Sequence, residues 1–261
     1  MASYLYLVLG LIFLAAAALA GIVRPDLRKG IICVGIGGAI WGPISEIWFF
    51  RDYWHPESVI GHPILEDIIY GAGIAAVASC IFKVVTRRTT QASSGPRTHY
   101  REAALMVLLY IAAMVALQMA LKVNSILVAI AVYVIAACYV VARRRDLWTA
   151  SVCTAVMMGV VAVCGYGLGL NFLVPEPRTL AQIWLLYGKP LGVEILGYVP
   201  VTEVIWYTAW GLLLGVLYEF ATGQYLIRLK SISAVGEDAS VAHAEISPPT
   251  ARAAARNEQG T

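Results

Sequence analysis

Seven long apolar segments constrain how this chain can fold more than any other feature of its sequence. A helix needs about 20 mostly apolar residues to cross the hydrocarbon core of a bilayer. The segments that meet or approach this length are 3–23, 30–50, 64–85, 103–121, 124–142, 147–169 and 200–221. With 60% hydrophobic and only 13% charged residues, the composition excludes an ordinary soluble domain. We therefore expect an all-α, polytopic membrane bundle of seven transmembrane helices.

The positions of lysine and arginine predict how this bundle is oriented. Fifteen of the 19 Lys and Arg residues lie near the ends of the first, third and fifth segments or in the C-terminal tail. Cytoplasmic loops carry such an excess, so we expect a multi-pass protein of the cell membrane with its N-terminus outside. The polar tail, 228–261, is predicted to be disordered and cytoplasmic. Because no aromatic residues accompany the basic ones in a patch, nucleic-acid binding is not expected.

One short motif occurs twice in the chain. Residues 63–70 read PILEDIIY and residues 200–207 read PVTEVIWY, so that both fit P-[IV]-x-E-x-I-x-Y. We expect the membrane domain, 1–227, to contain two parallel three-helix repeats, at about 1–86 and 124–227. The helix at about 103–121 would connect them and give both repeats the same orientation.

Four carboxylates lie inside the predicted spans, where a charge usually faces the bundle interior or a wet cavity. They are Glu46, Glu66, Asp67 and Glu203. A carboxyl group among apolar walls favours its protonated form and is suited to act as an acid. A structural alternative exists for Glu66 and Glu203, which follow a proline at a helix start, where an acid meets the helix dipole favourably. Both interpretations stay open for Asp67, whereas Glu46 lies too far into its helix to cap it.

Aromatic residues follow these acids at helical spacing. Tyr70 lies four residues after Glu66, and residues 203, 207 and 210 form one stripe. The predicted cavity wall consists of Trp41, Trp48, Tyr70, Tyr207 and Trp210. The alternative for each is ordinary packing or a place in the interfacial belt. We expect Trp54, Trp184, Tyr187 and Tyr198, in the outer loops, to lie at the level of the lipid headgroups.

The remaining polar residues are assigned no chemistry. Glu219 is expected at the interface, and His55 and His62 are expected there rather than at a metal. The acids expected to be solvated in loops are Asp52, Glu57, Glu176 and Glu194. The five cysteines all fall in apolar segments without C-x-x-C spacing, which indicates small side chains buried in the lipid. No cofactor motif is visible, so no cofactor or metal is predicted.

Several of these features resemble the lycopene cyclase domain, a small membrane cyclase that occurs as heterodimers in some bacteria and fused in archaea and fungi. The resemblance rests on the start Ser3-Tyr4-Leu5-Tyr6-Leu7, the tryptophan- and acid-bearing segment 30–50, Trp54, Gly61 and the first P-x-x-E motif. The segment from Gly197 to Glu203 resembles the second half of that domain. The similarity covers most of residues 1–225.

The resemblance implies ring closure at the ends of a linear carotenoid without net redox change. A terminal double bond is protonated, the neighbouring alkene attacks the cation, and a proton is lost. Glu66 and Glu203 would be acid and base, with Asp67 and Glu46 assisting. The partners implied are a hydrophobic isoprenoid substrate and the lipid bilayer. A second subunit is not required, since both halves are in one chain.

The chain also departs from this family, which usually has two adjacent acids in each motif. Leu65 and Thr202 stand at the first of these positions. This leaves open a cyclase that acts on a non-carotenoid prenyl substrate. A non-enzymatic membrane module that binds or transports a lipophilic small molecule is the other alternative.

Overall fold

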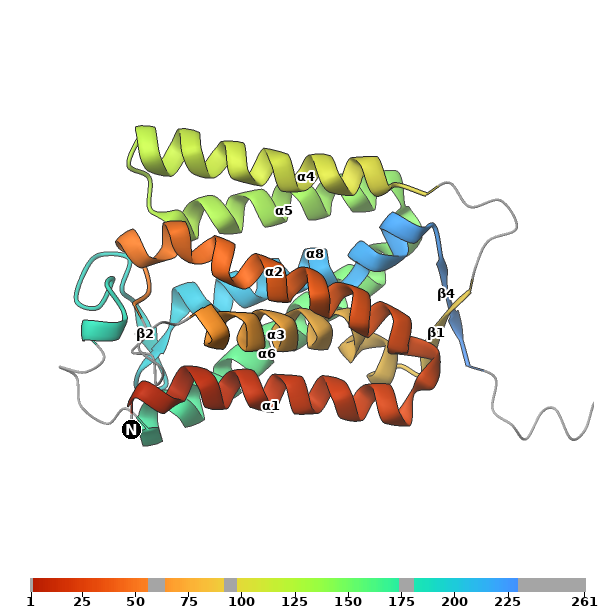
Figure 1. Cartoon of the computed structure of the whole chain (residues 1–261), viewed down its shortest axis with the longest axis horizontal. Helices are drawn as coiled ribbons and strands as arrows, with labels where there is room; N and C mark the ends of the chain where they lie inside the picture. The colour runs from red at the N-terminus through yellow and green to blue at the C-terminus, as the bar shows by residue number, and fades with distance from the viewer. Residues whose placement is uncertain (1, 56–63, 92–97, 174–180, 230–261) are drawn as a thin grey trace, which may run out of the picture. The chain divides into compact units, whose positions relative to one another are not determined.

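The computed structural model describes residues 2–55, 64–91, 98–173 and 181–229, and these contain seven helices long and apolar enough to cross a membrane (Figure 1). The helices are α1 (Ala2–Val23), α2 (Arg28–Asp52), α3 (Ile64–Val85), α4 (Tyr100–Ala113) with its π-helical continuation η2 (Met114–Ala120), α5 (Ser125–Arg143), α6 (Trp148–Leu173) and α8 (Val201–Thr222). The prediction of an all-α membrane bundle is confirmed. Of the tail predicted to be disordered, 228–261, Arg228 instead ends a short strand, and 230–261 lies outside the described residues, as do Glu57, Gly61, His62, Pro63 and Glu176.

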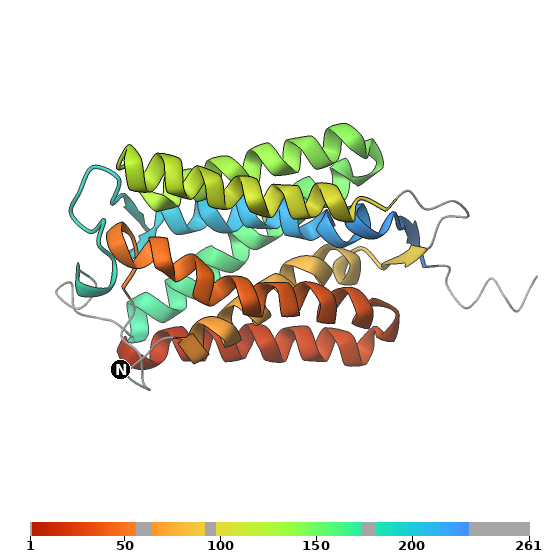
Figure 2. The same cartoon turned by 45° about the horizontal axis from the view of Figure 1, so that its top comes forward.

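Two helices, α3 and α8, hold the bundle together. The helix α3 packs against α1 and α2, α8 packs against α5 and α6, and the two central helices contact each other. In Figure 2 the blue α8 lies between the yellow-green α4 and the red and orange α1 to α3. The glutamates of both P-x-x-E motifs, Glu66 and Glu203, lie in the first turns of these central helices, and both are buried.

Glycines allow α2 and α3 to approach closely. A Cβ atom added to Gly38 would lie 2.1 Å from the carbonyl oxygen of Gly71, and one added to Gly42 would lie 2.3 Å from that of Asp67. Small residues four apart are a common way for membrane helices to bring their backbones together, because lipid provides no hydrophobic drive for association. This contact fixes the position of the first turn of α3 against the middle of α2.

Two matching turns mark one end of the bundle, which we call the basic end. Short helices η1 (Pro25–Leu27) and η3 (Arg145–Leu147) precede α2 and α6. In the first turn Arg24 forms an ion pair with Asp26, and in the second Arg144 forms one with Asp146, each at 2.7 Å. The same local structure thus starts the second helix of each predicted repeat. The parallel repeat itself remains a prediction.

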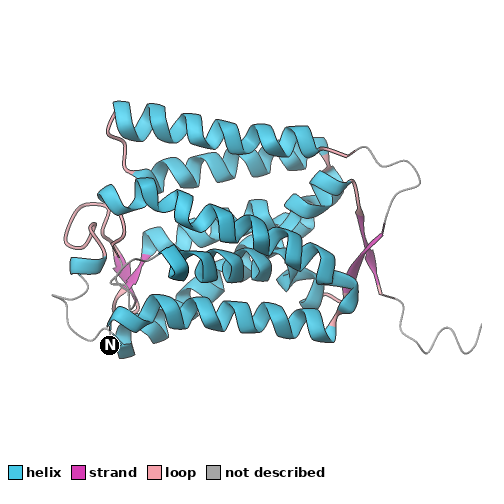
Figure 3. Ribbon diagram, viewed as in Figure 1, coloured by secondary structure: helices cyan, strands magenta, loops and turns pink. Residues whose placement is uncertain are grey.

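Short strands, which the sequence did not predict, lie at both ends of the helices (Figure 3). At the basic end β1 (Arg88–Gln91) pairs with β4 (Tyr225–Arg228). At the opposite end, which we call the acidic end, β2 (Glu194–Ile195) pairs antiparallel with β3 (Val199–Pro200). The first sheet joins the segments that follow the two central helices.

Glu219 is not interfacial, as the sequence had suggested, but fully buried. The Nζ atom of Lys83 on α3 lies 2.5 Å from Oε1 of Glu219 on α8, and the two side chains are 4% and 0% exposed. A buried charge requires a partner of opposite sign. The prediction was wrong because that partner lies on a helix 136 residues earlier in the chain.

Asp52 is likewise not a solvated loop residue. It ends α2, and its Oδ1 accepts a hydrogen bond from the hydroxyl of Ser125 at 2.5 Å. The backbone N–H of Ser125 and the amide of Gln118 donate to the same carboxylate at 3.1 and 3.3 Å. The first N–H groups of a helix have no acceptor within the helix, and the Asp52 carboxylate accepts from one of those of α5.

Candidate functional site

A small cavity of about 60 Å³, which we call the acid cavity, lies in the half of the bundle nearer the acidic end. Two carboxylate residues, Glu46 from α2 and Glu203 from α8, contribute to its lining. The aromatic residues of the lining are Tyr6, Trp41, Phe49, Tyr53, Trp54, Tyr70, Tyr133, Tyr166, Trp206 and Trp210. The fold therefore brings two of the four predicted acids together within an aromatic wall.

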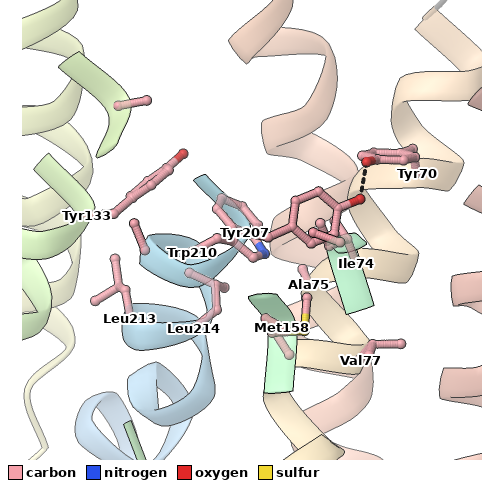
Figure 4. Packing of buried hydrophobic residues seen from close by; sticks show 14 of the residues in the cluster. Tyr70, Ile74, Ala75, Val77, Tyr133, Met158, Tyr207, Trp210, Leu213 and Leu214 are labelled. Carbon is pink, nitrogen blue, oxygen red and sulfur yellow. Dashed lines mark hydrogen bonds between the residues drawn. The ribbon is translucent and has the colours of Figure 1, made fainter. Parts of the chain in front are cut away.

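Tyrosine hydroxyls surround the Glu203 carboxylate. The hydroxyl of Tyr53 donates to Oε1 of Glu203 at 2.5 Å, and Tyr166 also forms a hydrogen bond with this carboxylate. The hydroxyl of Tyr166 lies 3.1 Å from that of Tyr70, which in turn is hydrogen-bonded to Tyr207 (Figure 4). Glu203 is thus one member of a buried network that reaches α2, α3, α6 and α8.

Tyr53 is held at the end of α2 as a neutral donor. Burial, together with the charge of the neighbouring Glu203, raises the pKa of the Tyr53 hydroxyl well above its ordinary value. The phenol consequently stays protonated, and its O–H donates a hydrogen bond to the carboxylate oxygen. A second contact, 3.5 Å to the Thr202 hydroxyl, places the ring over the start of α8.

Glu46 approaches the cavity differently. Its Oε2 atom is buried and has no hydrogen-bond partner within the described parts of the chain. The carboxylate is near enough to Asp67 and Glu203 to interact with their charges. Bringing several carboxylates together away from water disfavours ionising all of them. This arrangement is suited to proton transfer.

Asp67 and Glu66 lie in the first turn of α3 and do not line the acid cavity. Both are buried, with exposures of 1% and 0%. Tyr6, which does line the cavity, forms a hydrogen bond with Asp67. Asp67 is therefore linked to the cavity through Tyr6, and the neighbouring Glu66 acts on Asp67 through its charge.

The five aromatic residues predicted to form the wall are divided by the structure. Trp41, Tyr70 and Trp210 line the acid cavity. Tyr207 stands behind Tyr70, and the Trp48 ring packs edge-on near Tyr110 of α4, with centroids 6.3 Å apart. Their functional roles stay predictions.

Seven aromatic residues of the cavity lining were not predicted from the sequence as cavity residues: Tyr6, Phe49, Tyr53, Trp54, Tyr133, Tyr166 and Trp206. Tyrosine and tryptophan are frequent near membrane interfaces, so their presence in an apolar segment carries no specific signal. The one available hint was the aromatic density of residues 48–54, WFFRDYW. Within it only Trp48 was predicted to line a cavity, and Trp54 was placed at the lipid headgroups.

The segment after α6 folds back over the acidic end. Backbone hydrogen bonds join Leu185 N–H to the Tyr53 carbonyl at 2.9 Å and His55 N–H to the Ile183 carbonyl at 2.7 Å. Trp54 and Trp184 pair across this contact and are only 6% and 0% exposed. Backbone pairing thus draws both tryptophans into the protein, and their predicted place at the level of the headgroups stays a prediction.

A larger apolar groove adjoins the acid cavity. Its volume is about 530 Å³, within the usual range for a small-molecule site, and it runs between α2, α4, α5 and α8. Trp41, Tyr133 and Trp210 line both spaces, and we call these three residues the aromatic partition. The Trp41 Nε1–H donates to the Tyr133 hydroxyl at 3.4 Å, while the rings of Tyr133 and Trp210 lie 5.2 Å apart.

Metal ligands do not gather at this site: no group of three or more His, Cys, Asp or Glu residues that could hold an ion occurs in the part of the chain that the structure describes. Its polar groups are carboxylates, phenols and indoles. Comparison with known proteins finds no match, whether among family models, curated proteins or solved structures.

Proposed function

We propose that this protein is a membrane-embedded isoprenoid cyclase, with a carotenoid as the favoured substrate. The observation that carries the proposal is that Glu46 and Glu203 line one small aromatic cavity at the end of a long apolar groove. The resemblance to the lycopene cyclase domain supports the same conclusion. The reaction closes a ring without net redox change and requires only a proton donor and a proton acceptor.

The surroundings favour the cationic intermediate that such a reaction forms. Protonation of a terminal double bond leaves a carbocation, which the next alkene attacks to close the ring before a proton leaves. Aromatic faces such as those of Trp206 and Trp210 attract a cation. A cavity of about 60 Å³ holds little water besides a substrate end, which protects the cation from hydration.

The geometry suggests separate roles for the acids. Glu46, with its unpartnered oxygen, is the proposed proton donor. Glu203 is the proposed acceptor, because the hydrogen bonds donated by Tyr53 and Tyr166 stabilise a carboxylate charge. Asp67 would exchange protons with the cavity through Tyr6. Glu66, which does not line the cavity, would position the first turn of α3.

Expression in lycopene-accumulating cells, with chromatography of the pigments, tests this proposal. We expect cyclised pigments of unchanged mass from the natural chain. Glu46→Gln and Glu203→Gln should each lower product at least 100-fold, while the control Glu194→Gln, in β2, should not. Unchanged lycopene with the protein present in the membrane would count against a carotenoid substrate. Natural turnover in both glutamine variants would refute the assigned roles.

The groove by itself also favours a second candidate, a non-enzymatic module that binds a lipophilic small molecule. Its volume of about 530 Å³ is sufficient for binding without chemistry. In that case the purified protein would retain a polyene and release it unchanged. Glu46→Gln and Glu203→Gln would then have no effect on the pigment composition of the cells.

A further inference from the structure

The apolar groove has two chemically different ends. Toward the acidic end it stops at the aromatic partition. At the basic end its lining becomes polar, with Lys29, Tyr100, Thr222 and Gln224. Lys29 carries the only charge among the described residues that line the groove. A ligand that matches both ends is an amphiphile.

A polar cavity adjoins the groove at the basic end. It has a volume of about 120 Å³, and Lys29, Tyr218 and Gln224 line both spaces. Lys83, Thr90 and Gly30 also line it, as do two acids, Asp26 and Glu219. Its size admits a phosphate group beside the end of a chain.

The two lysines and two acids that line this polar cavity balance, and Arg24, the ion-pair partner of Asp26, brings the local sum to one positive charge. Asp26 is paired with Arg24, and Oε1 of Glu219 is paired with Lys83, whereas Oε2 of Glu219 is buried without a hydrogen-bond partner in the described residues. Lys29 has neither an ion-pair nor a hydrogen-bond partner in the described residues, and its side chain is exposed. It also stands in the first turn of α2, which contains no acid, so it faces the positive end of the helix dipole. An anion at this point would interact favourably with both.

The length of the groove suits a single extended chain. Lys29 and Trp41 are separated by twelve residues of α2, which corresponds to about 18 Å at about 1.5 Å per residue. The far end of such a chain reaches the aromatic partition, directly beside the acid cavity. An anionic end group at Lys29 would therefore place the opposite end of the chain next to Glu46 and Glu203.

From this arrangement we propose that the groove takes a prenyl chain with a phosphorylated end, its phosphate in the polar cavity at Lys29 and its terminal double bond at the aromatic partition. The inference rests on the proposed cyclase function, because it names the substrate class of the acid cavity. It keeps the cyclase chemistry but replaces the carotenoid named above with a prenyl phosphate, the kind of non-carotenoid prenyl substrate that the sequence left open. A saturated phospholipid chain would bring no double bond to the carboxylates.

Ligand binding to the full-length protein, purified into nanodiscs of uncharged lipid, tests this inference. The probe is radiolabelled geranylgeranyl diphosphate, with geranylgeraniol and phosphatidylglycerol as competitors. We expect the unlabelled diphosphate to compete at least 10-fold better than the alcohol. Lys29→Gln should weaken the diphosphate at least 10-fold and leave the alcohol unchanged. The matched control, Lys189→Gln in the segment at the acidic end, should alter neither.

Three results would overturn the inference. The first is equal affinity for the alcohol and the diphosphate, and the second is no effect of Lys29→Gln. The third is displacement of the probe by phosphatidylglycerol at the same concentration, which would identify a lipid headgroup as the occupant. The binding measurement does not require turnover. Lycopene cyclised in cells by a protein that fails to bind the diphosphate would refute this inference and leave the cyclase intact. Diphosphate binding by a protein that cyclises nothing would support the binding site and refute the cyclase function.

Discussion

The contact between Tyr53 and Glu203 illustrates how single residues from distant parts of the chain combine into a site. They are 150 residues apart, yet the phenol donates to the carboxylate at 2.5 Å. Tyr166 adds a second hydrogen bond to the same carboxylate. The surroundings of the Glu203 carboxylate are therefore built by side chains from other helices.

Replacing Tyr53 by phenylalanine tests whether its hydrogen bond to Glu203 contributes to the reaction. The ring remains, while one hydrogen bond to a charged group, worth about 1.5–3 kcal/mol, is lost. We expect Tyr53→Phe to lower the initial rate of ring formation by about 10- to 100-fold with unchanged protein levels. Tyr4→Phe, at a residue 54% exposed, is the control and should keep the natural rate. A natural rate in Tyr53→Phe would show that the hydrogen bond has no part in the reaction.

At this scale the sequence revealed the acids but not their partners. A carboxylate such as Glu46 stands out in an apolar segment because burying a charge is costly. Tyr53 and Tyr166 do not stand out, since tyrosine is common in membrane proteins. Asp52 and Glu219 were placed in solvent or at the interface because their partners, Ser125 and Lys83, are close only in three dimensions.

Among the elements, the contact between α2 and α3 determines where the acids meet. Gly38 and Gly42 let the backbone of α2 approach that of α3 at Gly71 and Asp67. The sequence predicted both helices, because the length of a span is a local property. It did not predict their packing, because a glycine four residues from another is compatible with many partners.

Alanine substitutions at adjacent glycines test how tight this contact is. A Cβ atom on Gly38 would meet the Gly71 carbonyl oxygen at 2.1 Å, whereas one on Gly37 would meet nothing within 4 Å. We expect Gly38→Ala to lower the free energy of unfolding in detergent by about 1–3 kcal/mol, as overpacking does. Gly37→Ala should be neutral or slightly stabilising, because alanine favours the helix. Equal stability of the two variants would contradict the close approach.

The ion pair between Lys83 and Glu219 joins the two central helices. Removing one partner of a buried pair leaves an uncompensated charge and costs about 3–5 kcal/mol. We expect Lys83→Met to show such a loss in thermal unfolding, and Lys83→Met combined with Glu219→Leu to recover most of it. A double variant as unstable as the sum of its single variants would show that the two residues act independently.

For the molecule as a whole, six of the seven long helices in the described residues form two groups of three around the α3–α8 contact, and α4 packs against α5 and α8. The first group is α1 to α3, and the second is α5, α6 and α8. Hydropathy along the sequence predicted the number of spans, and the repeated motif suggested the grouping. The structure adds the contacts that join the groups: Tyr70 with Tyr207, Lys83 with Glu219, and β1 with β4. None of these follows from either group alone.

These contacts predict that the chain still assembles when it is cut between Ser94 and Gly95, after the first group. The two fragments, expressed together, should copurify from detergent, because the α3–α8 contact and the strand pairing lie between them. Lys83→Glu in the first fragment would place two like charges in a buried contact and should abolish copurification. Adding Glu219→Lys to the second fragment restores opposite charges and should restore assembly. Fragments that copurify regardless of these charges would show that the ion pair does not hold the two groups together.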